Sequence, residues 1–193
     1  AVDEAERDWA AVVSSRGRLA RVDAALAPVG YRTLLTWQLA EVDGRPGLSD
    51  ALLSRTDVIV DDVGRLMPLL KTGQADYAFA YRSTCLASDV RYIAIGPAID
   101  LSDPDTDYAA AEAIAMLPNG QAMTFTGKPI IWTLSIPRQA EGAALAREFV
   151  TYLLSRPDLM TKAGLTPITP PRYYGSTELA MPIDGVARGG PLR

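Results

Sequence analysis

The sequence predicts an α/β fold in which a largely parallel sheet is covered by helices on both faces. Short runs of apolar and β-branched residues alternate along the chain with segments of helical apolar periodicity, and this alternation is typical of parallel sheets. The chain has 193 residues, of which 48% are hydrophobic and 22% are charged. A chain of this size buries most of the surface that it exposes when unfolded, so its core requires no metal and no disulfide.

The spacing of apolar residues along the chain predicts the individual helices and strands. Apolar residues at helical spacing predict helices at residues 4–15, 49–54, 63–73 and 139–155. A further helix is predicted to begin near Gly30 and to end near residue 43. Strands are expected at residues 18–23, 56–60, 76–81, 92–95 and 130–136. Pro28 and Gly30 mark a tight loop, and Asp61 or Asp62 can cap the helix that follows them. Residues 100–120 and the chain beyond Gly164 are expected to be irregular, because turn-forming residues recur there.

Two of these helices show an apolar face in the sequence. In the helix after Gly30 the face consists of Leu35, Leu39 and Val42. In the helix at 139–155 it consists of Leu145, Phe149, Tyr152 and Leu153. Both faces are expected to pack against other elements.

Composition and charge exclude several functions. The formal net charge is −4, so nucleic acid is not an expected partner, because phosphate binding depends on clustered Lys and Arg. No stretch reaches the roughly 20 apolar residues of a membrane span, and no signal peptide is visible in this chain. The chain has no histidine and one cysteine, which removes the commonest general base and zinc ligand.

The remaining reactive residues suggest no catalytic or metal site. Cys85 has no histidine to generate a thiolate and is expected to be a small apolar residue. Asp61, Asp62 and the aspartates of residues 100–107 lack the spacing of a calcium loop and fit capping and turns instead. We therefore expect no enzyme, no catalytic residue, no cofactor and no metal.

Two polar segments are expected where strands end and helices begin, the edge at which α/β folds bind ligands. The candidate ligand-binding residues are Gly30, Tyr31, Arg32, Thr33, Tyr81, Arg82 and Ser83. Hydroxyl and guanidinium donors, with the aligned amides of a helix start, suit a tetrahedral oxyanion. An ordinary loop with Arg32 in a surface salt bridge, followed by an ordinary strand end, stays open as the alternative.

Residues 28–33 (Pro-Val-Gly-Tyr-Arg-Thr) and 76–83 (Asp-Tyr-Ala-Phe-Ala-Tyr-Arg-Ser) resemble the archaeal-type tungstate/molybdate-binding proteins of ABC importers. Further stretches are similar to that family in the same order: 69–73, 91–93, 99–101, 127–130 and the 146–149 helix through 170–171. The resemblance covers the chain from about Trp9 to Pro171.

This resemblance implies a type 2 periplasmic binding protein, whose two lobes close over an oxyanion. Residues 1–137 would form an α/β lobe resembling the second lobe, residues 138–171 the returning C-terminal helical segment, and residues 172–193 an irregular tail. The family's first lobe should precede Trp9 and is not found there, so self-association through the surface meant for it is a further expectation. The implied partners are a small oxyanion and an ABC importer membrane subunit, and the implied location is extracellular or periplasmic.

The chain departs from the family at two positions. Where the family places carboxylates associated with the metal centre of the bound oxyanion, this chain has Ala27 and Ala80. A methyl group cannot coordinate tungsten, whereas hydrogen bonding to a tetrahedral oxyanion remains feasible. The leading hypothesis is therefore an oxyanion-binding protein for ABC import. The alternative is a diverged, non-catalytic interaction or sensory module that retains the lobe fold without a small ligand.

Overall fold

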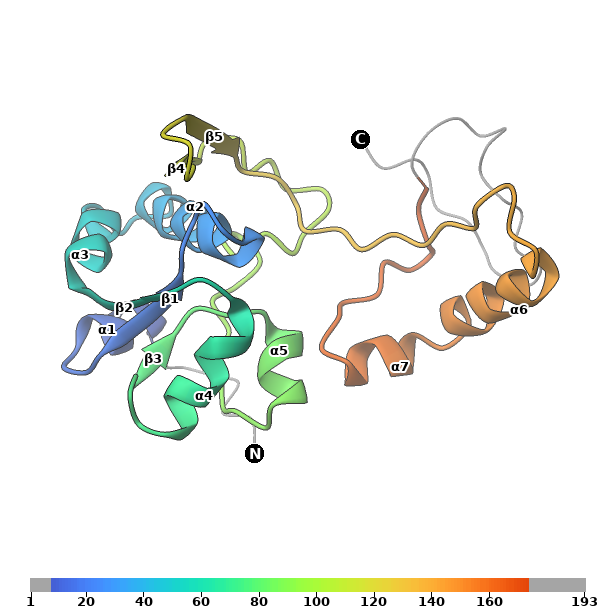
Figure 1. Ribbon diagram of the computed structural model, residues 1–193, viewed down its shortest axis with the longest axis horizontal. Coiled ribbons are helices and arrows are strands. Elements are labelled where there is room, and N and C mark those ends of the chain that lie inside the picture. Colours follow the sequence, from blue (N-terminus) through green and yellow to red (C-terminus); the bar gives the residue numbers. More distant parts are fainter. Residues whose placement is uncertain (1–7, 174–193) are drawn as a thin grey trace. The chain divides into compact units, whose positions relative to one another are not determined.

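The computed structural model describes residues 8–173, which fall into two compact units divided after Ile130 (Figure 1). The first unit contains α1 (Trp9–Ser14), β1 (Leu19–Val22), α2 (Pro28–Val42), α3 (Leu48–Arg55), β2 (Thr56–Val60), η1 (Val63–Arg65), α4 (Leu66–Lys71), β3 (Tyr77–Ala78), α5 (Arg82–Ala87), β4 (Glu112–Met116) and β5 (Ala122–Thr126). The second contains α6 (Ala143–Leu154) and α7 (Pro157–Lys162). Residues 4–7 of the first expected helix and residues 174–193 of the expected tail lie outside the described part.

A three-stranded parallel sheet organises the first unit, in the order β2-β1-β3. Leu19 of β1 is in register with Thr56 of β2 and with Tyr77 of β3. The α/β fold class with a parallel sheet flanked by helices is thereby confirmed. The carboxyl ends of all three strands lie at one edge of this sheet.

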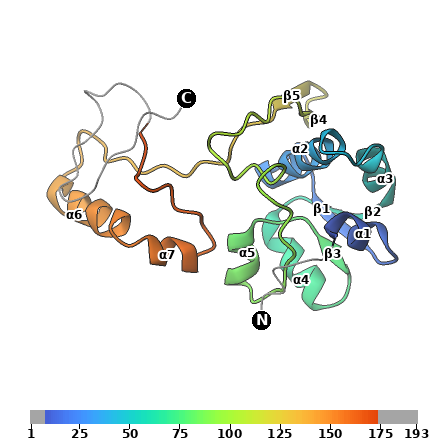
Figure 2. The ribbon, with the colours of Figure 1, turned by 180° about the vertical axis from the view of Figure 1, so that it is seen from behind.

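Helices cover both faces of the sheet, because successive side chains of β1 point to opposite sides. Leu19 packs in a cluster with side chains of α1, α2 and α3, whereas Ala20 and Val22 pack in a second cluster with Leu66 and Met67 of α4. Figures 1 and 2 show α2 and α3 on one side of the sheet and α4 on the other. The central strand is therefore buried on both faces.

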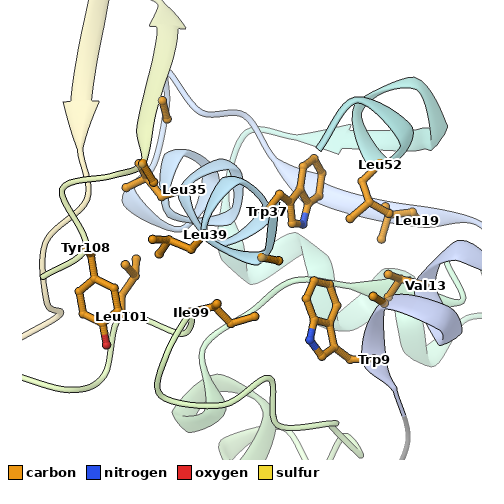
Figure 3. Close-up of a cluster of buried hydrophobic side chains, with 14 residues drawn as sticks. Trp9, Val13, Leu19, Leu35, Trp37, Leu39, Leu52, Ile99, Leu101 and Tyr108 are labelled. Atoms are coloured by element: carbon orange, nitrogen blue, oxygen red, sulfur yellow. The ribbon is translucent and has the colours of Figure 1, made fainter. Parts of the chain in front are cut away.

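The larger cluster is built on the inner face of α2 (Figure 3). Leu35 and Trp37 are 1% and 0% exposed, and Phe79 packs edge-on against the Trp37 ring with centroids 5.4 Å apart. Ile99, Leu101 and Tyr108 extend this cluster toward the β4–β5 hairpin. Val42, by contrast, is 69% exposed, so its predicted place on the buried face is wrong: the cluster on α2 ends at Ala40.

Aspartates tie the amino ends of the strands together. The Arg18 amide donates to Asp76 Oδ2 at 2.7 Å, and the Leu19 amide donates to Asp57 Oδ2 at 2.8 Å. The Arg18 guanidinium also lies 3.6 Å from Asp76 Oδ2. Each carboxylate joins the start of β1 to the start of a neighbouring strand.

Several predicted elements are confirmed and others need correction. The strands at 18–23 and 56–60 and the helices at 49–54, 63–73 and 139–155 are present with small shifts of their ends. Asp62 caps η1 by accepting from the Gly64 amide at 2.7 Å, as predicted. The strand expected at 76–81 shortens to two residues, Tyr77 and Ala78, because the chain turns into α5 at Arg82.

The strands predicted at 92–95 and 130–136 are wrong. Both segments are irregular in the structure, because an apolar run becomes a strand only where a neighbour accepts its backbone hydrogen bonds. Ile93 and Ile95 nevertheless pack against the larger cluster. Trp132 and Leu134 are 76% and 49% exposed.

An antiparallel hairpin begins within residues 100–120, which were expected to be irregular, and its second strand lies just beyond them. β4 and β5 pair from Glu112↔Thr126 to Met116↔Ala122. Its buried side chains include Ala113 and Ala115, which are small and poor strand formers. The hairpin is attached to α2, where Gln38 Oε1 accepts from the Glu112 amide at 2.8 Å.

In the second unit, the predicted apolar face of α6 is exposed. Leu145, Phe149 and Tyr152 are 71%, 58% and 52% exposed. The helix is thus confirmed, and the expected burial of this face is not met within the unit. Across residues 8–173, no helix combines the length and the apolar character that crossing a bilayer requires.

Candidate anion site at the carboxyl edge of the sheet

The tight connection after β1 delivers α2 to the carboxyl edge of the sheet. The Asp23 amide continues the ladder by donating to Val60 O at 2.8 Å, and Asp23 Oδ1 accepts from the Ala25 amide at 2.8 Å. Ala27 is extended, with φ −148° and ψ 149°, and Pro28 opens the helix. Proline suits this position because its fixed φ is helical and its missing N–H would be unpaired there. The helix therefore begins at Pro28, two residues earlier than predicted.

Gly30 lies in the first turn of α2 and not in a loop. A Cβ added there would lie 2.8 Å from Ala24 N and closer still to the carbonyl of Asp23. Its amide donates to Ala27 O at 2.9 Å. Gly30 therefore allows the helix to approach the preceding turn, and its own N–H is already used.

Arg32 and Tyr81 connect the two predicted polar segments. Arg32 Nη1 donates to Tyr81 Oη at 2.7 Å. The Arg32 Cζ atom lies 5.6 Å from the centroid of the Tyr31 ring and 5.8 Å from that of the Tyr81 ring, within the range of cation–π attraction. The structure thus brings Tyr31, Arg32 and Tyr81 together from positions that are far apart in the sequence.

The Arg32 guanidinium is half-buried and has no carboxylate partner among residues 8–173. Its hydrogen bond to Tyr81 is to a neutral oxygen, which supplies no counter-charge. Because Tyr81 Oη accepts from Arg32, the hydroxyl hydrogen of Tyr81 must point elsewhere. The pair can therefore offer both guanidinium N–H groups and a phenolic O–H to an incoming anion.

Thr33 does not share this surface. Its side chain is 4% exposed, and its hydroxyl donates to Val29 O at 2.7 Å within the helix. The hydroxyl hydrogen of Thr33 is therefore already engaged. Arg82 and Ser83 form the first turn of α5, where Arg82 is exposed and Ser83 is half-buried.

Ala27 and Ala80 lie at the same edge of the sheet. Both are half-buried, and both pack against the smaller cluster that contains Ala20, Val22 and Val60. Ala27 immediately precedes α2, and Ala80 comes two residues before α5. The surroundings of both methyl groups are accordingly apolar.

Phe125 is a neighbour of the site that the sequence did not indicate. Its ring stacks on Tyr31 with centroids 3.9 Å apart and an interplanar angle of 1°. It comes from β5, in a stretch just beyond residues 100–120 for which the sequence predicted no element. The dipeptide Asn119-Gly120 between two short stretches is a hairpin signal that would have located β5.

In the described part of the chain, the other reactive side chains form no second catalytic or metal-binding site. Cys85 is 7% exposed, and burial raises the pKa of its thiol, which disfavours the reactive thiolate. Among residues 8–173, no group of three or more His, Cys, Asp or Glu side chains is arranged to hold a metal ion.

Comparison with known proteins gives the family of the chain. The sequence profile described as "Bacterial extracellular solute-binding protein" matches residues 2–159. The chain belongs to this family of non-enzymatic, extracellular solute-binding proteins.

Curated relatives include proteins of several archaea. A Haloferax volcanii protein, named as a candidate molybdenum-binding protein of an ABC transporter, is 33% identical over 159 residues, which cover 81% of this chain and 50% of that protein. Uncharacterised solute-binding proteins of Methanococcus aeolicus and Halobacterium salinarum are each 28% identical, covering 77% and 86% of this chain and 50% and 54% of their own lengths. The chain spans about half the length of these relatives.

Proposed function

We propose that this chain binds a small tetrahedral oxyanion of the molybdate/tungstate type at the edge formed by Tyr31, Arg32 and Tyr81. It would form one wall of a cleft and deliver the anion to the membrane subunit of an ABC importer, outside the cytoplasmic membrane. Family membership supports the general role. The name of the Haloferax relative, together with residues 28–33 and 76–83, supports the choice of anion.

The observation that carries the proposal is the Arg32 guanidinium. A partly desolvated cation without a counter-ion is unfavourable, and an anion that accepts several hydrogen bonds removes this penalty. Tyr81 Oη holds one Arg32 N–H at 2.7 Å and so fixes the side chain near the edge of the sheet. We also assign Arg82 and Ser83, at the start of α5, to the site as additional hydrogen-bond donors.

The chemistry of this edge favours a fully deprotonated anion. Tyr81 offers a hydrogen and Arg32 only N–H donors, whereas Ala27 and Ala80 provide no acceptor and no metal ligand. Molybdate, tungstate and sulfate carry no proton near neutral pH, while inorganic phosphate carries one or two protons, each of which needs an acceptor. We therefore expect the first three anions to bind better than phosphate.

Isothermal titration with molybdate, tungstate, sulfate and phosphate tests this proposal. The expected result is measurable binding of the first three anions and weaker binding of phosphate. Because we propose that the chain provides one wall of the cleft, the titration should extend to millimolar anion. Absence of heat with all four anions, for a protein shown to be folded by circular dichroism, would rule the oxyanion function out.

A second function is favoured by the apolar surroundings of Ala27 and Ala80. An interaction or sensory module would keep the lobe fold and lose its small ligand. The double variant Ala27→Asp with Ala80→Glu restores both carboxylates of the related proteins. If tungstate binds to this variant but not to the unaltered chain, the edge of the sheet still has a suitable geometry but no longer binds a small ligand. That result supports the module. Binding by the unaltered chain supports the transport function.

A further inference from the structure

Phe125 of the hairpin β4–β5 is joined to Arg32 through an unbroken series of ring contacts. The Phe125 and Tyr31 rings are stacked at 3.9 Å. The Arg32 Cζ atom lies 5.6 Å from the centroid of the Tyr31 ring and 5.8 Å from that of the Tyr81 ring. One face of Tyr31 is thus occupied by Phe125, and Arg32 lies within 6 Å of the same ring.

The stack restrains a side chain that would otherwise move. Tyr31 is half-buried on α2, and a ring in such a position can adopt more than one rotamer. The hairpin is itself held to α2 by the 2.8 Å hydrogen bond from the Glu112 amide to Gln38 Oε1. Phe125 therefore presents a fixed surface to Tyr31.

A fixed Tyr31 ring restricts Arg32 in turn. A long side chain loses rotamer freedom when it is immobilised, and a residue that is already ordered before binding does not incur that cost on binding. Tyr81 supplies a hydrogen bond and one ring, and Tyr31 supplies the other ring. Without Phe125, the Tyr31 ring is no longer restrained, and only the contacts with Tyr81 still hold the Arg32 guanidinium.

We propose that Phe125 is a positioning residue of the anion site, which acts through Tyr31 to hold the Arg32 guanidinium in its binding orientation without touching the anion. This inference rests on the proposed oxyanion function for its effect on affinity. Its structural part, the coupling of Phe125 to Arg32, does not depend on that function.

The test compares Phe125→Leu with the unaltered chain in two measurements. The first is the dissociation constant for molybdate, which we expect to rise about two- to tenfold, in line with the contribution of an aromatic pair. The second is the ¹H–¹⁵N NMR signal of the Arg32 Nε–Hε group without ligand, assigned with Arg32→Gln. Ring currents from Tyr31 and Tyr81 should displace this signal, and the displacement should shrink in Phe125→Leu.

Three further variants serve as controls. Phe125→Tyr retains the stack and should restore both readouts, whereas Thr124→Ala, next to Phe125 on the exposed face of β5, should change neither. If Phe125→Leu does not fold, Phe125→Met removes the same ring, leaves Tyr31 in place and should change the Arg32 signal in the same direction.

The two measurements separate this inference from the proposed function. An Arg32 signal that does not move in Phe125→Leu overturns the positioning role, whatever happens to affinity. A displaced signal with an unchanged molybdate constant also overturns it. If the unaltered chain binds no oxyanion, the proposed function fails, and the Arg32 signal alone then decides whether Phe125 is coupled to Arg32.

Discussion

Arg32 Nη1 donates a 2.7 Å hydrogen bond to Tyr81 Oη, joining the helix after β1 to the segment after β3. The bond leaves the guanidinium charge without a carboxylate among the described residues and orients the Tyr81 hydroxyl hydrogen away from Arg32. Both consequences favour an anionic ligand at this edge of the sheet. The predictions below test the residues on which this account depends.

Tyr81→Phe should weaken molybdate binding about tenfold, because it removes both the acceptor that holds Arg32 and a donor to the anion. The ring is retained, so the cation–π contact persists. Calorimetric titration measures the change. Tyr77→Phe, which removes a hydroxyl from β3 in the same unit, is the matched control. Equal affinity of Tyr81→Phe and the unaltered chain would exclude Tyr81 from the site.

Thr33→Val should leave anion affinity unchanged, although Thr33 belongs to the polar segment that the sequence singled out. Its hydroxyl donates to Val29 O at 2.7 Å and is buried. Loss of this bond should cost about 1 kcal/mol of stability, measured by urea denaturation. A clear loss of affinity at unchanged stability would contradict the described position of Thr33.

Gly30→Ala should destabilise the first unit by about 1–3 kcal/mol, because the added methyl group enters space occupied by the backbone of Asp23 and Ala24. Urea denaturation followed by tryptophan fluorescence measures this. In Gly142→Ala the new methyl group meets no neighbour within 4 Å, and this control should leave the midpoint of the first unit unchanged. A stable Gly30→Ala protein would mean that α2 does not approach the turn as described.

Asp76 should make the stability of the first unit depend on pH in acid. The Arg18 amide, with help from its guanidinium, holds the pKa of Asp76 below its ordinary value of 3.8. A carboxyl whose pKa is depressed by folding stabilises the protein fully above its unfolded pKa, and this contribution disappears as pH falls through the folded pKa. Unfolding free energies measured from pH 5 downward should therefore fall less steeply in Asp76→Asn.

The control for this measurement is Asp89→Asn, at an exposed position with φ 52° that asparagine also tolerates. Its pH profile should follow that of the unaltered chain. An Asp76→Asn profile that also coincides with the unaltered one would show that Asp76 does not link β1 to β3.

The sequence predicted the parallel sheet because its strands carry their own signal. β1 and β2 are short, apolar runs next to helices of clear periodicity, so local pattern and tertiary environment agree. The same pattern failed for residues 130–136: Ile130 N donates to Leu101 O at 2.7 Å, but no residue of this segment is paired in a strand. Whether a neighbour exists is a property of the whole fold and cannot be deduced from the segment itself.

Part of the candidate anion site could also be predicted from the sequence. Tyr31, Arg32 and Tyr81 follow strands that end at one edge of the sheet, so their proximity follows from topology. The burial of Thr33 depends on the rotation of α2 about its axis, which the polar segment alone does not reveal. The stack of Phe125 on Tyr31 required the hairpin β4–β5, whose buried alanines gave little strand signal.

The most direct test of the central claim is a molybdate titration of Arg32→Gln beside Arg16→Gln. Both variants lose one positive charge, but Arg16 is exposed and precedes the amino end of β1, at the opposite edge of the sheet. We predict that Arg32→Gln abolishes binding and that Arg16→Gln binds like the unaltered chain. Retained binding in Arg32→Gln, or equal losses in both variants, would contradict the assignment of the anion site to Arg32.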